Sequence, residues 1–140
     1  MSRQIFVNLP VHNLDRSVQF FRSLGFEFEP KFTDEKAACM IICEHIFAML
    51  LVDVFFSTFT RKEVCDATQH TEVLVCITCE SRAQVDETVR KAVDAGGTVP
   101  RTPEDHGFLY SHAFEDPDGH IWELVWMNPA SAEMQQAEAS

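Results

Sequence analysis

The feature that most constrains this chain is an order of elements, one strand, one helix and three strands, that its sequence repeats. In the first half, apolar residues alternate with other residues from Gln4 to Val11, which is the period of a β-strand. A helix is predicted next, with Asn13 as its cap and Gly25 at its end. Three strand-like runs follow the helix, at residues 26–32, 37–43 and 47–54.

The second half repeats this order. Residues 72–78 alternate as a strand, and Ser81 with Gln84 forms a capping box before an apolar helical stripe that ends at Gly96. A short strand at residues 98–99 and two longer strands are predicted to complete this half. The longer strands cover residues 108–115 and 120–127, and the residues between them, Asp-Pro-Asp-Gly, are typical of a turn.

A repeated order of this kind predicts the α+β class, with two tandem βαβββ modules that form a cup-shaped open sheet. The modules are expected at about residues 3–54 and 70–127, with residues 55–69 as their connection, in a single domain of residues 1–127. One helix is expected to cover one face of each sheet. Residues 128–140 are small and polar and are expected to form a flexible tail.

Composition limits the partners of the chain. Its formal net charge is -11, so nucleic acid is not expected as a partner, because a phosphate backbone would be repelled. No run of about 20 apolar residues predicts a membrane helix, and the first residues lack the apolar core of a signal peptide. Five cysteines favour a reduced compartment, so a cytoplasmic location is expected. Cys76 and Cys79 match a C-x-x-C pattern but lie in a predicted strand, which favours a structural role.

Three segments together resemble one family. Residues 5–11 (IFVNLPV) and 14–21 resemble the opening of many vicinal-oxygen-chelate proteins, and residues 116–124 (DPDGHIWEL) resemble their closing hairpin. Residues 95–97 (AGG) after the second helix complete the match, which covers about residues 3–127. This superfamily includes glyoxalase I, bleomycin-resistance proteins and extradiol dioxygenases. The resemblance implies their fold and a small-molecule ligand.

The resemblance also implies a divalent metal held at four strand positions, in the first and last strand of each module. At these positions the chain has Phe6, then Leu50 or Leu51, then Glu72, and finally Glu123. Phenylalanine and leucine cannot bind a metal, and zinc, nickel or iron needs about three protein donors. The expected cofactor is therefore either none or a divalent metal at a rearranged site.

The predicted turn at residues 116–119 places Glu115 opposite His120 and His112 opposite Glu123. With Glu72, and with His70 if that strand begins early, His112 and Glu123 could form a replacement metal site. The alternative is a hydrogen bond between His112 and Glu123 in a polar pocket floor.

The predicted ligand pocket combines these positions with others on the same strands, and Glu123 is also the candidate catalytic residue. The pocket is expected to contain Phe6, Asn8, Leu50, Glu72, Tyr110, His112 and Glu123. The favoured function is binding of a small oxygenated or drug-like molecule, as in bleomycin resistance. The alternative is a metal-dependent lyase, isomerase or dioxygenase, such as a lactoylglutathione-lyase-like enzyme, so enzyme activity stays open.

Two aromatic groups have structural interpretations. Phe55, Phe56 and Phe59 cluster where the modules join, and are equally consistent with a dimer interface, a pocket lid or a local core. A homodimer is expected, because this junction is more apolar than a monomer needs to expose. Trp122 and Trp126 alternate away from Glu123 and are predicted to pack under the second helix.

Overall fold

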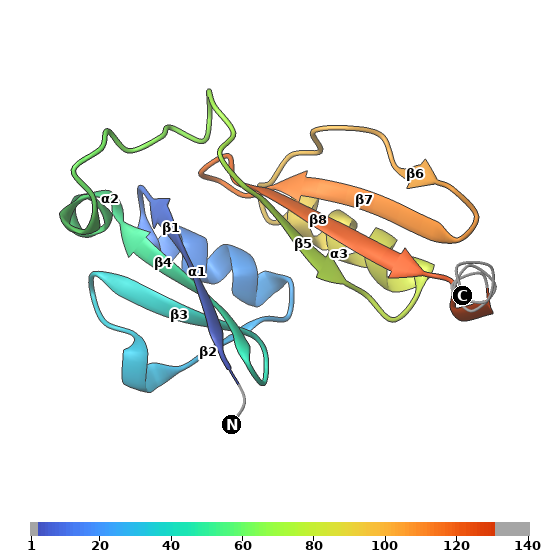
Figure 1. Cartoon of the computed structure of the whole chain (residues 1–140), viewed down its shortest axis with the longest axis horizontal. Coiled ribbons are helices and arrows are strands. Elements are labelled where there is room, and N and C mark those ends of the chain that lie inside the picture. The colour runs from blue at the N-terminus through green and yellow to red at the C-terminus, as the bar shows by residue number, and fades with distance from the viewer. Residues whose placement is uncertain (1–2, 131–140) are drawn as a thin grey trace. The chain divides into compact units, whose positions relative to one another are not determined.

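The computed structural model describes residues 3–130 and divides the chain into two units, residues 1–70 and 71–140 (Figure 1). Each unit holds one four-stranded mixed sheet with its helices. The order strand, helix, strand, strand, strand occurs in both units, so the predicted α+β class and the repeated βαβββ order are confirmed. No helix within the described residues is long and apolar enough to span a membrane. Apart from its first three residues, the predicted tail at 128–140 lies outside the described residues.

Unit 1 begins with strand β1 (Ile5–Val11) and helix α1 (Leu14–Ser23). Its other strands are β2 (Glu27–Phe28), β3 (Ala37–Cys43) and β4 (Ile46–Val52), and the sheet order is β1-β4-β3-β2. Strands β1 and β4 are parallel, and the other pairs are antiparallel. Strand β2 is shorter than predicted, because Pro30 begins a 3₁₀ turn that ends at Phe32.

After β4, unit 1 continues into two short helical segments. Helix α2 (Asp53–Phe56) follows the strand directly, and a 3₁₀ turn (Ser57–Phe59) follows the helix. The strand predicted to reach residue 54 therefore ends at Val52. The two segments carry aromatic side chains back over the sheet, where Phe55 and Phe59 meet edge to face with ring centroids 5.1 Å apart.

Unit 2 repeats this plan with strand β5 (Leu74–Thr78) and helix α3 (Arg82–Asp94). Strands β6 (Glu104–Asp105), β7 (Leu109–Glu115) and β8 (Ile121–Met127) follow, in the sheet order β5-β8-β7-β6. The strand predicted at residues 98–99 is only an isolated bridge between Thr98 and Glu115. The third strand of the module is instead β6, which pairs with β7.

Each helix packs on one face of its sheet, and each begins at the predicted cap. The Asn13 side chain accepts a hydrogen bond from the Arg16 amide at 3.1 Å, and Ser81 accepts one from the Gln84 amide at 3.0 Å.

The buried side chains form a separate core in each unit. The unit 1 core includes Leu9, Val11, Phe20, Phe21 and Leu50, and the unit 2 core includes Val85, Val89, Phe114, Trp122 and Leu124. The predicted packing of Trp122 in the core is confirmed.

The hairpin between β7 and β8 is organised by one buried carboxylate. Asp116 is only 5% exposed, and its Oδ1 accepts hydrogen bonds from the amides of Asp118 (2.9 Å) and His120 (3.1 Å). Its Oδ2 accepts a third from the indole of Trp122 at 3.0 Å. The Asp-Pro-Asp-Gly segment is therefore a turn, as predicted, and its first carboxylate ties the turn to the core.

Candidate functional site

In unit 1 we call the sheet face opposite α1 the second face. Strand alternation places Phe6 and Asn8 there, and the parallel register with β4 adds Phe47 and Leu51. The rings of Phe6 and Phe47 stack with centroids 4.7 Å apart. Leu50 instead pairs with Leu9 on the α1 side and is fully buried. The predicted pocket residue Leu50 is therefore a core residue, because a register difference of one residue reverses the face.

A pocket of about 430 Å³ lies on this second face. Its walls combine the sheet with the segment after β4, and the lining residues are Asn8, Leu51, Phe56, Phe59 and Thr60. None of these side chains is charged. The lining offers two aromatic rings and one aliphatic side chain, and the amide of Asn8 and the hydroxyl of Thr60 are its polar groups. Of the interpretations considered for Phe55, Phe56 and Phe59, the structure therefore places Phe56 and Phe59 in a pocket wall.

The second face of the unit 2 sheet, opposite α3, has a different character. Glu123 lies there on β8, with Cys76 of β5 and Ala113 of β7 as its cross-strand neighbours. Arg101 reaches it from the loop before β6. Its Nη2 donates to Glu123 Oε2 at 3.3 Å and to Ser111 Oγ at 2.7 Å. The retained carboxylate is thus one half of an ion pair.

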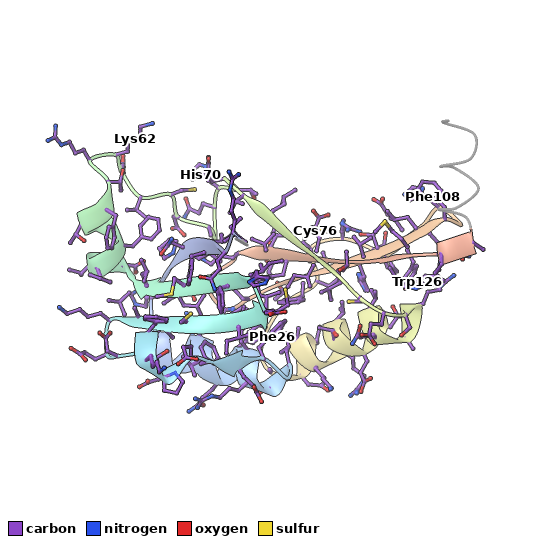
Figure 2. The ribbon with its side chains drawn as sticks, turned by 60° about the horizontal axis from the view of Figure 1, so that its bottom comes forward. Phe26, Lys62, His70, Cys76, Phe108 and Trp126 are labelled. Atoms are coloured by element: carbon purple, nitrogen blue, oxygen red, sulfur yellow. The ribbon has the colours of Figure 1, made fainter. Side chains whose placement is uncertain are left out.

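Cys76 shares this environment, and Figure 2 marks its position on β5. Burial raises the pKa of the Cys76 thiol, the negative charge of Glu123 raises it further, and Arg101 opposes both effects. The thiol is therefore protonated at neutral pH and is neither a ready nucleophile nor a ready metal ligand. Burial is also the largest cause that raises the pKa of Cys79, so this C-x-x-C pair lacks the depressed thiol pKa of a redox site.

The predicted pairing of His112 with Glu123 is wrong. The observed register places Glu123 opposite Ala113 and His112 opposite Leu124, so the two side chains lie on opposite faces of the sheet. The cause is the Asp116 carboxylate, which takes the amide of His120 and leaves Glu115 opposite Ile121. The loop is one residue longer than the turn signal implied.

His112 and Tyr110 lie on the face that α3 covers, which is not the face of Glu123. Tyr110 donates its hydroxyl hydrogen to Asp86 at 2.5 Å, and the Arg82 guanidinium stacks 4.3 Å from its ring centroid. His112 Nδ1 is buried without a hydrogen-bond partner in the part of the chain that the structure describes. Burial is the main cause that lowers the pKa of His112, so its imidazole is neutral at pH 7. Through Asp86 and Arg82, Tyr110 connects α3 to β7.

Neither Glu72 nor His70 lies on strand β5. Glu72 is exposed and lies before β5, which begins at Leu74. His70 lies in the connecting segment, where its amide donates to the Asp66 carbonyl at 2.8 Å (Figure 2).

Phe6 lies seven residues before the α1 cap at Asn13 (13 − 6), and Leu74 lies seven residues before the α3 cap at Ser81 (81 − 74). The position equivalent to Phe6 is therefore Leu74, not Glu72.

The chain thus lacks the donors that the metal of this fold requires. Phe6 and Leu74 present only carbon at two of the four positions, the second face of β4 offers Met49 and Leu51 without an oxygen or nitrogen donor, and Glu123 at the fourth position is paired with Arg101. The proposed replacement set is not assembled, because His112 and Glu123 face opposite ways. Across residues 3–130 no group of three or more His, Cys, Asp or Glu side chains is placed to hold a metal ion. The residues do not fit a divalent metal at these positions.

Comparison with known proteins identifies what the chain is similar to. Residues 3–42 match the family model described as bleomycin resistance protein-like N-terminal. Among curated proteins, none is detectably similar.

Solved structures match over most of the chain. A hypothetical protein from S. aureus is 26% identical, with a TM-score of 0.76, and the match covers 90% of this chain and 95% of that one. A glyoxalase/bleomycin resistance protein/dioxygenase family enzyme from Burkholderia phytofirmans is 13% identical, with a TM-score of 0.75 and coverage of 91% and 100%. The fosfomycin resistance protein FosX from Listeria monocytogenes is 19% identical, with a TM-score of 0.65 and coverage of 91% and 93%. The last two likenesses show the fold alone.

Proposed function

We propose that the chain is a member of the vicinal-oxygen-chelate superfamily and that it binds a small molecule without a metal, in the manner of a bleomycin-resistance protein. The observation that carries this proposal is the pocket of about 430 Å³ on the second face of unit 1. A volume of this size suits a small organic ligand. The match of residues 3–42 to the bleomycin-resistance-like model lies in the same unit and supports the choice.

The lining of the pocket indicates the ligand class. The rings of Phe56 and Phe59 favour a flat, apolar body, to which aromatic contacts each contribute about 0.5–1.5 kcal/mol. Asn8 and Thr60 can donate to or accept from a carbonyl or hydroxyl oxygen. No lining side chain carries a charge, and the chain as a whole is strongly acidic. The ligand we propose is therefore an uncharged aromatic molecule that bears an oxygen function.

A metal-dependent lyase, isomerase or dioxygenase has less support. Each of these activities polarises substrate oxygens on a metal ion, and three of the four metal positions here have no oxygen or nitrogen donor. Glu123, the fourth, forms an ion pair with Arg101. We therefore propose no reaction step that uses a metal.

A fluorescence titration with the neutral aromatic probe N-phenyl-1-naphthylamine tests the binding proposal. The wild-type chain is expected to bind and brighten the probe. Phe56→Ala is expected to weaken binding about tenfold, which corresponds to ~1.4 kcal/mol. Phe32→Ala is the matched control, because Phe32 is 59% exposed and does not line the pocket. Equal affinity of the two variants would place the probe elsewhere and refute the assignment of this pocket.

We also propose that the chain forms a homodimer through apolar strand edges. Strand β1 is an edge strand of its sheet, and Ile5 and Phe6 on it are 52% and 40% exposed. An exposed apolar edge strand favours pairing with another chain. Sedimentation should give twice the 15.9 kDa of one chain, and Ile5→Lys should shift the protein towards monomer. Val54→Lys, at an exposed apolar site in α2, is the control. A single species at the monomer mass across micromolar concentrations would contradict the dimer.

A cytoplasmic location is proposed from the cysteines. All five are free thiols, which is typical of a reducing compartment. Fractionation of cells that express the chain would test this location, and recovery outside the cytoplasm would contradict it.

A further inference from the structure

The ion pair between Arg101 and Glu123 is built into the second face of unit 2. Glu123 comes from the central strand β8, Ser111 from the neighbouring strand β7, and Arg101 from the loop before β6. A single guanidinium nitrogen, Nη2, donates to both Glu123 and Ser111. The other terminal nitrogen, Nη1, donates to the carbonyl of Thr102 at 3.2 Å. Three contacts therefore fix the cation over the carboxylate.

Partial burial distinguishes this pair from the surface pairs of the same unit. The side chains of Arg101 and Glu123 are 29% and 27% exposed, whereas those of Arg90 and Asp94 on α3 are 63% and 68% exposed. A partly buried carboxylate needs a partner of opposite charge, because the solvent that would otherwise stabilise it is reduced. Arg101 is the cation that provides this compensation.

We infer that Arg101 is the resident cation of this sheet face and supplies Glu123 with the positive charge that a divalent metal would bring in a metal-dependent relative. A metal ion at Glu123 would have to displace the guanidinium from the carboxylate, or lie beside a positive charge that repels it. The neighbouring strand positions offer too few donors for a metal, since Ala113 and the leucine at position 74 present only carbon, the Cys76 thiol is protonated, and the Ser111 hydroxyl already accepts a hydrogen bond from Arg101. Glu123 therefore anchors Arg101, and its retention does not imply a metal centre.

This inference does not depend on the small-molecule pocket. That pocket lies in unit 1, whereas Arg101, Ser111 and Glu123 all belong to unit 2. Loss of probe binding in the Phe56→Ala variant and loss of the ion pair are measured separately. Either proposal can therefore fail while the other stands.

Titration calorimetry with Zn²⁺ and with Ni²⁺ on the full chain is the first test. The wild-type chain and Glu123→Gln should take up the same amount of each metal with the same affinity, whatever other surface groups contribute. Glu87→Gln on α3 removes the same charge from an exposed helix surface and serves as the control. A stoichiometric metal site that is present in the wild type and absent only in Glu123→Gln would overturn the inference.

A double-mutant cycle in urea unfolding is the second test. Arg101→Met and Glu123→Gln should each lower the unfolding midpoint. In the Arg101→Met background, Glu123→Gln should lower it no further or should raise it, because the unpaired charge is removed. The pair Arg90→Met and Asp94→Asn on α3 should show additive, smaller shifts. Additive effects at Arg101 and Glu123 would overturn the inference, and if Arg101→Met does not fold, the metal titration of Glu123→Gln still decides it.

Discussion

The two units share one order of elements and one sheet order, but the second faces of their sheets carry different chemistry. In unit 1 that face bears the stacked Phe6 and Phe47 rings and an uncharged pocket. In unit 2 the same face bears the ion pair of Arg101 and Glu123. Most residues that face each helix are apolar in both units, with Tyr110 and His112 as polar exceptions on the α3 side, because packing against the helix constrains them. The second faces are not constrained in this way, so their chemistry differs between the units.

The turns that join the last two strands of each sheet also differ, and a substitution in one of them gives the largest expected effect on the free energy of unfolding. The β7–β8 turn holds a buried carboxylate with three hydrogen-bond donors, whereas Glu44 in the β3–β4 turn has a side chain that is 88% exposed. Asp116→Ala should lower the free energy of unfolding by about 3 kcal/mol, because buried donors lose their acceptor. Glu44→Ala should change it by less than about 0.5 kcal/mol. Urea denaturation measures both, and equal effects would show that the Asp116 carboxylate does not organise the turn.

The packing of α3 on its sheet includes a hydrogen bond between Tyr110 and Asp86, and its removal gives the next largest expected effect. Tyr110→Phe removes the hydroxyl that donates to Asp86 at 2.5 Å and should cost about 1 kcal/mol of unfolding free energy. In an Asp86→Asn background the same substitution should cost less, because the charge-assisted bond is already weakened. Thermal unfolding of the four proteins tests this. A cost that is independent of residue 86 would mean that the hydroxyl contributes through another contact.

The smallest expected effect is on the pH dependence of folding stability, and it comes from His112 in unit 2. Burial lowers the pKa of His112 in the folded chain below its ordinary value of 6.5. The unfolded chain therefore binds a proton more readily, so His112 should make the fold less stable as the pH falls through about 6.5. His112→Leu should flatten this dependence between about pH 7 and 5. Identical pH profiles for the wild type and His112→Leu would contradict the prediction.

The features that could be predicted from the sequence are local ones. Asn13 and Ser81 are helix caps because their own side chains accept the amide three residues later, and strand alternation is visible within each run. The register of the last hairpin depends instead on where the Asp116 carboxylate binds, and a turn signal alone does not contain that information. The resulting shift of one residue misassigned the neighbour of Glu123.

The site was less predictable than the fold. Arg101 lies in a loop without periodicity, so no pattern indicated that it reaches Glu123 and Ser111. The missed equivalence of Phe6 and Leu74 had a usable signal, because each lies seven residues before its helix cap (13 − 6 and 81 − 74). Counting from the cap is more reliable than counting from the start of an apolar run, since the cap is fixed by a hydrogen bond. The pocket residue Thr60 follows the 3₁₀ turn of residues 57–59, in a segment interpreted as a connection.

The most direct test of the account is whether the chain binds its ligand class without a metal. The N-phenyl-1-naphthylamine titration would be repeated after exhaustive treatment with EDTA, and again after Zn²⁺ or Ni²⁺ is restored. Because the pocket is lined by Asn8, Leu51, Phe56, Phe59 and Thr60, and none of these residues is a carboxylate, histidine or cysteine, all three dissociation constants should agree. A loss of affinity of tenfold or more after EDTA, reversed by the metal, would contradict the account.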